Sequence, residues 1–174
     1  SEMCIRDRYE DALGTYLVKL SGRELSIKDS RVLSVLLHCI GDFERISDHA
    51  VNIRDAAVEM HKKDLKFSEK AKQELRVFSN AIRDILDRAV MAFETGDVEL
   101  AKEVEPLEQV VDALNKEEKQ RHINRLRTGT CTIELGFILS DITTSLERVA
   151  DHCSNIGGCI IQSEEDSYRL HEYL

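Results

Sequence analysis

The chain has 174 residues, one proline, no tryptophan, 33% charged residues and a formal net charge of −9. This length allows one good core or two small associated ones, and the composition is typical of an all-helical protein with solvated outer faces. The acidic balance excludes a nucleic-acid partner, because phosphates require patches of Lys and Arg. No apolar run approaches the roughly 20 residues that span a bilayer, so we expect the chain itself to be soluble.

The cysteines are odd in number and include no C-x-x-C pair. They mostly lie among apolar residues, which indicates packing in a reduced, cytosolic compartment rather than a disulfide scaffold. The five are Cys4, Cys39, Cys131, Cys153 and Cys159.

The first half of the chain predicts two helices. Residues 1–8 enter a helical pattern without a start signal, so we interpret them as a non-native leader. A helix follows over 9–20 and closes at Gly22. Asp29 or Ser30 is expected to cap a long second helix over 30–62, which carries a continuous apolar stripe at helical spacing.

The second half predicts three helices and a tail. Ser68 starts a helix over 68–93, Gly96 follows as its C-terminal residue and Asp97 caps the next helix. That next helix, 98–127, contains the single proline, Pro106, which predicts a kink. Gly129 ends it. Thr130 is expected to cap the last helix, which covers 130–162 and precedes an acidic tail over 163–174.

A ten-residue string occurs twice. Glu44–Ile53 reads ERISDHAVNI, and Glu147–Ile156, 103 residues later, reads ERVADHCSNI. Six of the ten positions are identical, and both strings lie late in a long helix. Internal repetition of this kind indicates duplicated structural units. We therefore expect an all-α antiparallel helix bundle of two related three-helix units, the first of which lacks its N-terminal helix. Residues 9–62 form this first repeat, and residues 63–162 form the second within one domain of 174 residues.

Each repeated string places two carboxylates one helical turn apart. Residues four positions apart project from the same helix face, and two unpaired acids at that spacing repel each other by a few tenths of a kcal/mol. The preceding helix of each unit holds a matching pair, and antiparallel packing brings two pairs together. The eight candidate ligands are Glu44, Asp48, Asp7 and Asp11 in the first unit, and Glu108, Asp112, Glu147 and Asp151 in the second.

Four oxygen donors from two helices suit hard or borderline cations. A single acid pair on a helix is usually only a solvated face, but two pairs within a repeated string favour cation binding. We expect divalent or ferric ions, with Fe, Mn, Zn and Mg all open. Asn52 and Asn155 could add carbonyl oxygens, whereas His49 and His152 lie about 100° round the helix from Asp48 and Asp151 and are expected to be structural.

The strings Leu37–Ile53 and Leu146–Ile156 resemble the duplicated signature of PhoU-like domains. That resemblance implies two three-helix bundles that bind multinuclear metal clusters through E(D)-x-x-x-D pairs. The ending, including His171–Leu174, resembles more narrowly the cytosolic C-terminal domain of bacterial Na+/phosphate cotransporter proteins. It implies a metal-binding regulatory domain at the cytoplasmic face of the membrane, whose partner is a phosphate transporter in the N-terminal part of the same protein.

Other functions stay open at this point. One is a free-standing PhoU-type regulator of phosphate uptake, another is a carboxylate-bridged di-iron oxidase, and a third is a purely structural helical adaptor. Di-iron sites of the oxidase kind use a Glu-x-x-His spacing, which neither repeated string contains, so we expect no enzyme. Homo-oligomers are expected, because a truncated first unit exposes apolar helix faces.

Overall fold

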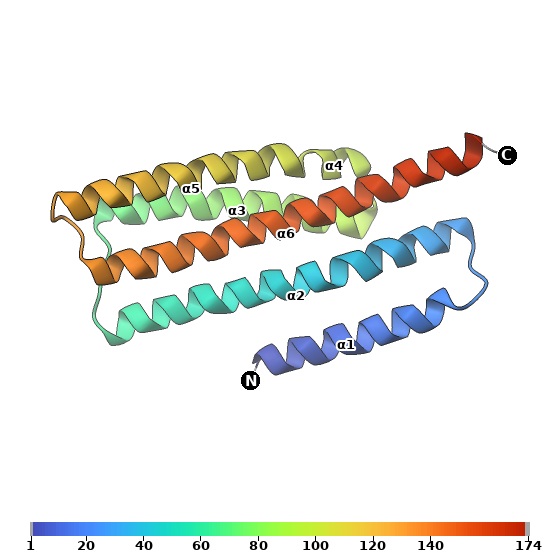
Figure 1. Ribbon diagram of the computed structural model, residues 1–174, viewed down its shortest axis with the longest axis horizontal. Coiled ribbons are helices and arrows are strands. Elements are labelled where there is room, and N and C mark those ends of the chain that lie inside the picture. The colour runs from blue at the N-terminus through green and yellow to red at the C-terminus, as the bar shows by residue number, and fades with distance from the viewer. Residues whose placement is uncertain (1, 173–174) are drawn as a thin grey trace.

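The computed structural model describes the backbone of residues 2–172 and the side chains of residues 5–164. The described residues form helices joined by short connections, with no strand among them, as the sequence predicted, and Figure 1 shows the helices as one elongated bundle. The last two residues of the predicted tail, 173–174, lie outside the described residues. The six helices are α1 (Glu2–Ser21), α2 (Ile27–Lys62), α3 (Glu69–Thr95), α4 (Val98–Lys102), α5 (Val104–Arg127) and α6 (Ile133–Glu172).

The two long helices α2 and α6 run antiparallel through the middle of the bundle (Figure 1). Helix α1 packs antiparallel on α2, and α5 packs antiparallel on α6. The pair α1–α2 therefore corresponds to the pair α5–α6, as the repeat predicted. Helix α3 covers α5 and α6, and no described helix covers α1 and α2 in the same way.

Several helix ends lie where the sequence placed them. Ser68 caps α3 by accepting a hydrogen bond from the backbone N–H of Ala71 at 3.2 Å. Gly96 ends α3 with φ +68°, in the left-handed region that glycine adopts without a Cβ clash. Asp97 then caps α4 through the backbone N–H of Leu100.

Four expected helix bounds are wrong. Helix α1 begins at Glu2 rather than at residue 9. Helix α2 is capped by Ser26, whose Oγ accepts from the N–H of Asp29 at 3.1 Å, so it begins before the expected caps. Helix α6 begins after Thr132, whose Oγ1 accepts from the N–H of Leu135, because the Thr130 hydroxyl instead donates to the carbonyl of Arg125. Helix α6 also continues past Gln162 to Glu172, since no Pro or Gly interrupts it there.

The expected kink at Pro106 is a complete break. Helix α4 ends at Lys102, and α5 starts at Val104, so proline is the third residue of the new helix. A proline in the first turn removes an N–H that would have had no partner within the helix. Gly157 of α6 lies against this break, where an added Cβ would meet the carbonyl oxygen of Ala101 at 3.1 Å.

The core consists of two neighbouring apolar clusters. The larger lies among α3, α5 and α6 around Ile85, Val104 and Cys153, and the smaller joins α2, α6 and the α3–α4 junction around Cys39 and Ile156. On α2 the apolar residues Val35, Phe43, Ile46 and Ile53 pack against these clusters, whereas Val32 is exposed and Leu33 is buried. None of the described helices is long and apolar enough to cross a bilayer.

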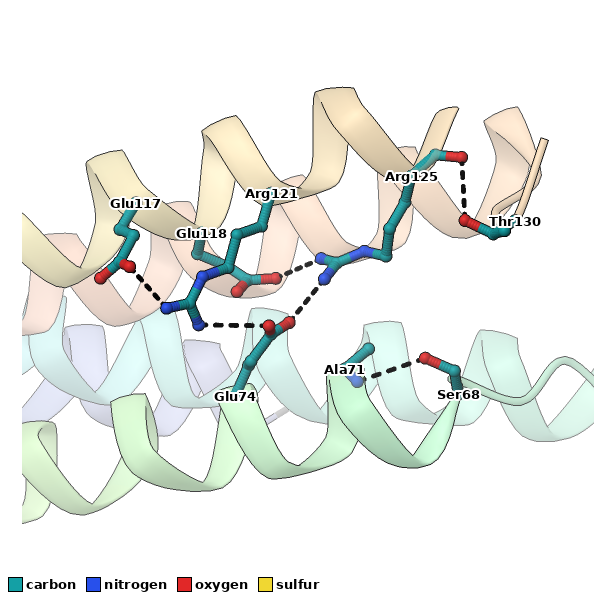
Figure 2. Close-up of polar contacts among 8 residues, drawn as sticks. All are labelled: Ser68, Ala71, Glu74, Glu117, Glu118, Arg121, Arg125 and Thr130. Atoms are coloured by element: carbon teal, nitrogen blue, oxygen red, sulfur yellow. Dashed lines mark hydrogen bonds and ion pairs between the residues drawn. The ribbon is translucent and has the colours of Figure 1, made fainter. Parts of the chain in front are cut away.

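A buried ion-pair network ties α3 to α5 at one end of the bundle, as Figure 2 shows. The guanidinium of Arg125 pairs with Glu74 and with Glu118, each at 2.5 Å. Both carboxylates are only 7% exposed, and Arg125 is 15% exposed. Arg121, 44% exposed, adds pairs with Glu74 and Glu117. Burial raises the pKa of Glu118, and the positive charge of Arg125 opposes that rise. Burying these carboxylates is unfavourable on its own, so the network depends on the Arg125 guanidinium that pairs with both of them.

Removing that cation should destabilise the fold strongly. We expect Arg125→Met to lower the free energy of unfolding by about 3 kcal/mol at pH 7, because it leaves two buried carboxylates without their partner. Arg121→Met is the matched control and should cost about 1 kcal/mol or less, since its guanidinium is largely solvated. Urea denaturation of both variants measures the difference. Equal and small losses would show that the network contributes little.

Candidate functional site

The second carboxylate cluster comprises Glu108 and Asp112 on α5 and Glu147 and Asp151 on α6. Helices α5 and α6, which carry these two pairs, pack antiparallel against each other. Burial raises the pKa of Glu108, and the negative charges of Asp112, Glu105, Asp151 and Glu147 raise it further. The four predicted carboxylates of this unit therefore lie close enough to repel one another.

Basic side chains contact three members of the second cluster. Lys116 lies 3.7 Å from Asp112, and Lys119 lies 3.5 Å from Glu147. Arg148 pairs with Asp151 of its own helix at 3.1 Å. Such exposed pairs contribute little to stability, so they are easily exchanged for another cation.

The first carboxylate cluster comprises Glu44 and Asp48 on α2 with Asp7 and Glu10 on α1. Burial raises the pKa of Glu44, and hydrogen bonding to Asp48 together with the charges of Asp48, Glu10 and Asp7 adds to the rise. The predicted α1 pair was Asp7 with Asp11. The structure leaves Asp11 exposed and places the half-buried Glu10 toward α2, where its Oε1 lies 3.4 Å from the Cβ position of Gly41.

Arginine neutralises part of the first cluster. Arg6 donates a hydrogen bond to Oδ1 of Asp48 at 2.8 Å, and this contact is the main cause of the lowered pKa of Asp48. The guanidinium is only 22% exposed, so this pair is better shielded from water than those of the second cluster. A cation entering the first cluster has to compete with Arg6 for this carboxylate.

No group of three or more His, Cys, Asp or Glu side chains in the described part of the chain is gathered tightly enough to hold a metal ion. Four of the carboxylates instead pair with Arg or Lys, namely Asp48, Asp112, Glu147 and Asp151. The ligand sets predicted for the two clusters stay predictions.

The two repeats meet at a pair of stacked histidines. The rings of His49 and His152 lie 5.7 Å apart with an interplanar angle of 27°. His152 Nδ1 contacts Oδ1 of Asp42 at 2.8 Å, and Asn155 donates its amide to the same oxygen at 3.1 Å. Burial lowers the pKa of His49, whose Nδ1 has no hydrogen-bond partner within the described residues. These histidines thus connect α2 of the first repeat with α6 of the second.

Sequence reasoning missed two of these polar residues. Glu10 escaped because Asp7 and Asp11 offered the expected spacing of four residues, although Asp7 and Glu10 also share a face. Asp42 escaped because it lies two residues before the repeated string, and the corresponding position in the second unit is Ser145. The sequence signal that could have identified Asp42 is that its position is polar in both copies but differs in residue type.

A family model described as the PhoU domain matches this chain over residues 5–57 and 75–160. The "Phosphate-specific transport system accessory protein PhoU homolog 1" of Thermotoga maritima is 30% identical over 130 residues, which is 75% of this chain and 55% of that protein. The corresponding homolog of Pseudomonas putida is 25% identical over 82% of this chain and 55% of its own length. The chain thus spans slightly more than half the length of these curated relatives.

A solved structure has the same fold. The crystal structure of PhoU from Pseudomonas aeruginosa superposes with a TM-score of 0.85 at 22% sequence identity, and the match covers 94% of this chain and 78% of that one.

Because neighbouring carboxylates repel Glu108, we expect the effect of its substitution on the free energy of unfolding to depend on pH. A carboxyl pKa raised in the folded state means that stability is lost as pH rises from the ordinary value of 4.5 through the raised one. Glu108→Gln should therefore increase the free energy of unfolding by about 0.5 kcal/mol at pH 7, and the gain should vanish near pH 4. Chemical denaturation at both pH values tests this. Glu99→Gln, which removes an exposed carboxylate paired with Lys102, is the control and should show no gain.

Proposed function

The chain belongs to the PhoU domain family, and from that premise we propose that it regulates a phosphate transport system by binding cations and a transporter. The observation that carries this proposal is the duplicated carboxylate cluster. Each repeat holds acidic side chains on two antiparallel helices that pack together, and one family model matches a segment of each repeat. Regulation by binding, without catalysis, is what such a surface supports.

The comparisons favour an accessory regulator over the cotransporter domain that the end of the sequence suggested. The printed names of the curated relatives describe accessory proteins of a phosphate-specific transport system. We therefore prefer the PhoU-type regulator, with a membrane phosphate transporter as its partner at the cytoplasmic face. Fusion to a transporter is the second form of the same proposal and rests on the ending His171–Leu174.

The donor set fits a hard or borderline cation. Both carboxylate clusters offer oxygen donors, which suit Mg, Mn or ferric iron, and carboxylates also bind Zn. Glu108, Asp112, Glu147 and Asp151 would hold the ion in the second cluster. Glu44, Asp48, Asp7 and Glu10 would do so in the first. A bound ion would neutralise the carboxylates and cross-link the two helices of each pair. No redox or hydrolytic step is required of it.

The two clusters differ in how strongly their carboxylates are already paired with basic side chains. The second carries a half-buried Glu108 carboxyl that its neighbours repel, and its other carboxylates pair with the largely exposed side chains of Lys116, Lys119 and Arg148. The first contains the shielded Arg6–Asp48 pair. We propose that the second cluster binds the more tightly, because less existing pairing has to be broken there.

Calorimetry and thermal unfolding of the chelator-treated protein with Mn2+ test cation binding directly. We expect binding and a rise in Tm for the wild type, and loss of most of both effects in the double variant Glu147→Gln, Asp151→Asn. The double variant Asp84→Asn, Asp87→Asn removes the same charge from exposed acids of α3 and should bind Mn2+ as the wild type does. If the wild type takes up neither Mn2+, Zn2+, Mg2+ nor Fe3+, cation binding is excluded.

Phosphate uptake in cells tests the regulatory role separately. Expression of the chain in a bacterium that lacks its own PhoU protein should change the rate of labelled-phosphate uptake. The Glu147→Gln, Asp151→Asn variant should change it less, at equal protein level. An unchanged uptake rate, for a folded protein that binds Mn2+, would contradict the regulatory proposal and leave cation binding intact.

A further inference from the structure

The face of α5 that packs into the bundle changes from apolar to polar halfway along the helix. Val104 and Val111 are fully buried, and the same face continues with the buried Asn115 and Glu118 and the half-buried His122. Within the described residues, two buried atoms of this stretch have no hydrogen-bond partner, namely Oδ1 of Asn115 and Nδ1 of His122. An unpaired polar atom away from water is unfavourable, so this half of α5 is held less firmly than its apolar half.

The His122 ring lies directly against the backbone of α6. A Cβ added at Gly136 would meet Nε2 of this ring at 2.5 Å and Cε1 at 2.9 Å, which is too close for either atom to stay where it is. Gly136 is itself buried. The glycine therefore leaves the space that the imidazole occupies, and a side chain at this position would displace the ring.

A proton on His122 would disturb this contact. A neutral imidazole carries one N–H group, whereas the protonated ring carries an N–H at both nitrogens. Because Nδ1 is buried without a partner, protonation would leave a charged donor unpaired inside the protein. Burial accordingly lowers the pKa of His122, and the positive charge of Arg125, one turn further along α5, lowers it further.

The acidic groups around the ring are already paired. In the described part of the chain, α5 contacts α3, α4 and α6, and α4 lies at its other end. The charged residues closest in helical register are Glu118, Lys119 and Arg125 on α5, Glu74, which meets Arg125 from α3, and Glu134, two residues before Gly136 on α6. Glu74 and Glu118 pair with Arg125, and Glu134 pairs with Lys63 of α2. A proton on His122 would thus add a positive charge beside Arg125, whose carboxylate partners are already engaged.

We propose that the contact between His122 and Gly136 is an acid-sensitive contact that holds α5 on α6. The neutral ring packs in the space beside Gly136. The ring that has taken up a proton from the solvent leaves this space for water, and the last turns of α5 then separate more readily from α6. This device is distinct from the proposed cation sites, because His122 lies 10 residues beyond Asp112, about 15 Å along the helix.

Acid should therefore weaken the folded state at this end of the bundle. A histidine whose pKa is lowered in the folded state contributes stability above its ordinary value of 6.5, and that contribution is lost as pH falls from there through the lowered value. His49, whose pKa burial also lowers, acts in the same sense, and Glu118, whose pKa burial raises, acts in the opposite sense. Both are present in a variant that differs only at position 122, so a comparison with that variant isolates His122.

Thermal unfolding of the full chain and of His122→Phe, each at about pH 7.5 and about pH 5, tests the proposal. Phenylalanine keeps a flat ring but takes up no proton. We expect Tm to fall between the two pH values by about 3 °C more in the wild type than in the variant. The ratio of wild-type to variant amide hydrogen exchange over residues 118–127 should also rise several-fold on acidification. His61→Phe, which replaces an exposed histidine at the end of α2, is the control and should behave as the wild type does.

Gly136→Ala tests the contact from the side of α6. The added methyl group should displace the ring into water, where it takes up a proton without penalty, so this variant should show the same small loss of Tm in acid as His122→Phe. If His122→Phe does not fold, His122→Leu takes its place. An equal acid-dependent loss of Tm in the wild type and in the position-122 variant would overturn the proposal, and so would a wild-type loss in Gly136→Ala.

Discussion

The antiparallel seam between α2 and α6 is the interaction on which the rest of the structure depends. It is mostly apolar, with Cys39, Ile156 and Ile160 buried along it. Polar side chains also meet across it. Asp42 reaches across from α2 to His152 and Asn155 of α6, and it is only 15% exposed. A shielded carboxylate needs its partners, so this contact penalises any other register of the two helices.

The seam positions both carboxylate clusters, which lie on its two flanks. Each repeated string contributes its Glu and Asp to a carboxylate cluster and its His to the stacked pair of histidine rings. The same stretch of helix therefore carries acidic side chains and a contact between the repeats. His49 directly follows Asp48, and His152 directly follows Asp151. The stack therefore fixes how the two clusters face relative to each other.

Charged groups are distributed according to what they do. Where they hold helices together, as at Glu74, Glu118 and Arg125, they are buried and closely paired. Where they are proposed to bind ions, as at Glu108 and Asp112, they are half-buried and imperfectly compensated. The same residue types thus produce a fixed structural contact in one place and an available negative surface in another, and burial makes the difference.

The sequence by itself determined the helical class, the duplicated unit, the caps at Ser68, Gly96 and Asp97, and the acid pairs one turn apart. All of these follow from local helix geometry. Residues four positions apart share a helix face, and a glycine that follows a helical segment ends the helix in the left-handed conformation. It could not determine that Glu10 rather than Asp11 faces α2, or that Asp42 reaches His152. Those contacts depend on how each helix is rotated about its axis against its neighbour. One residue corresponds to 100° of rotation, and the packing of many distant side chains sets that angle. Only the tertiary structure decides it.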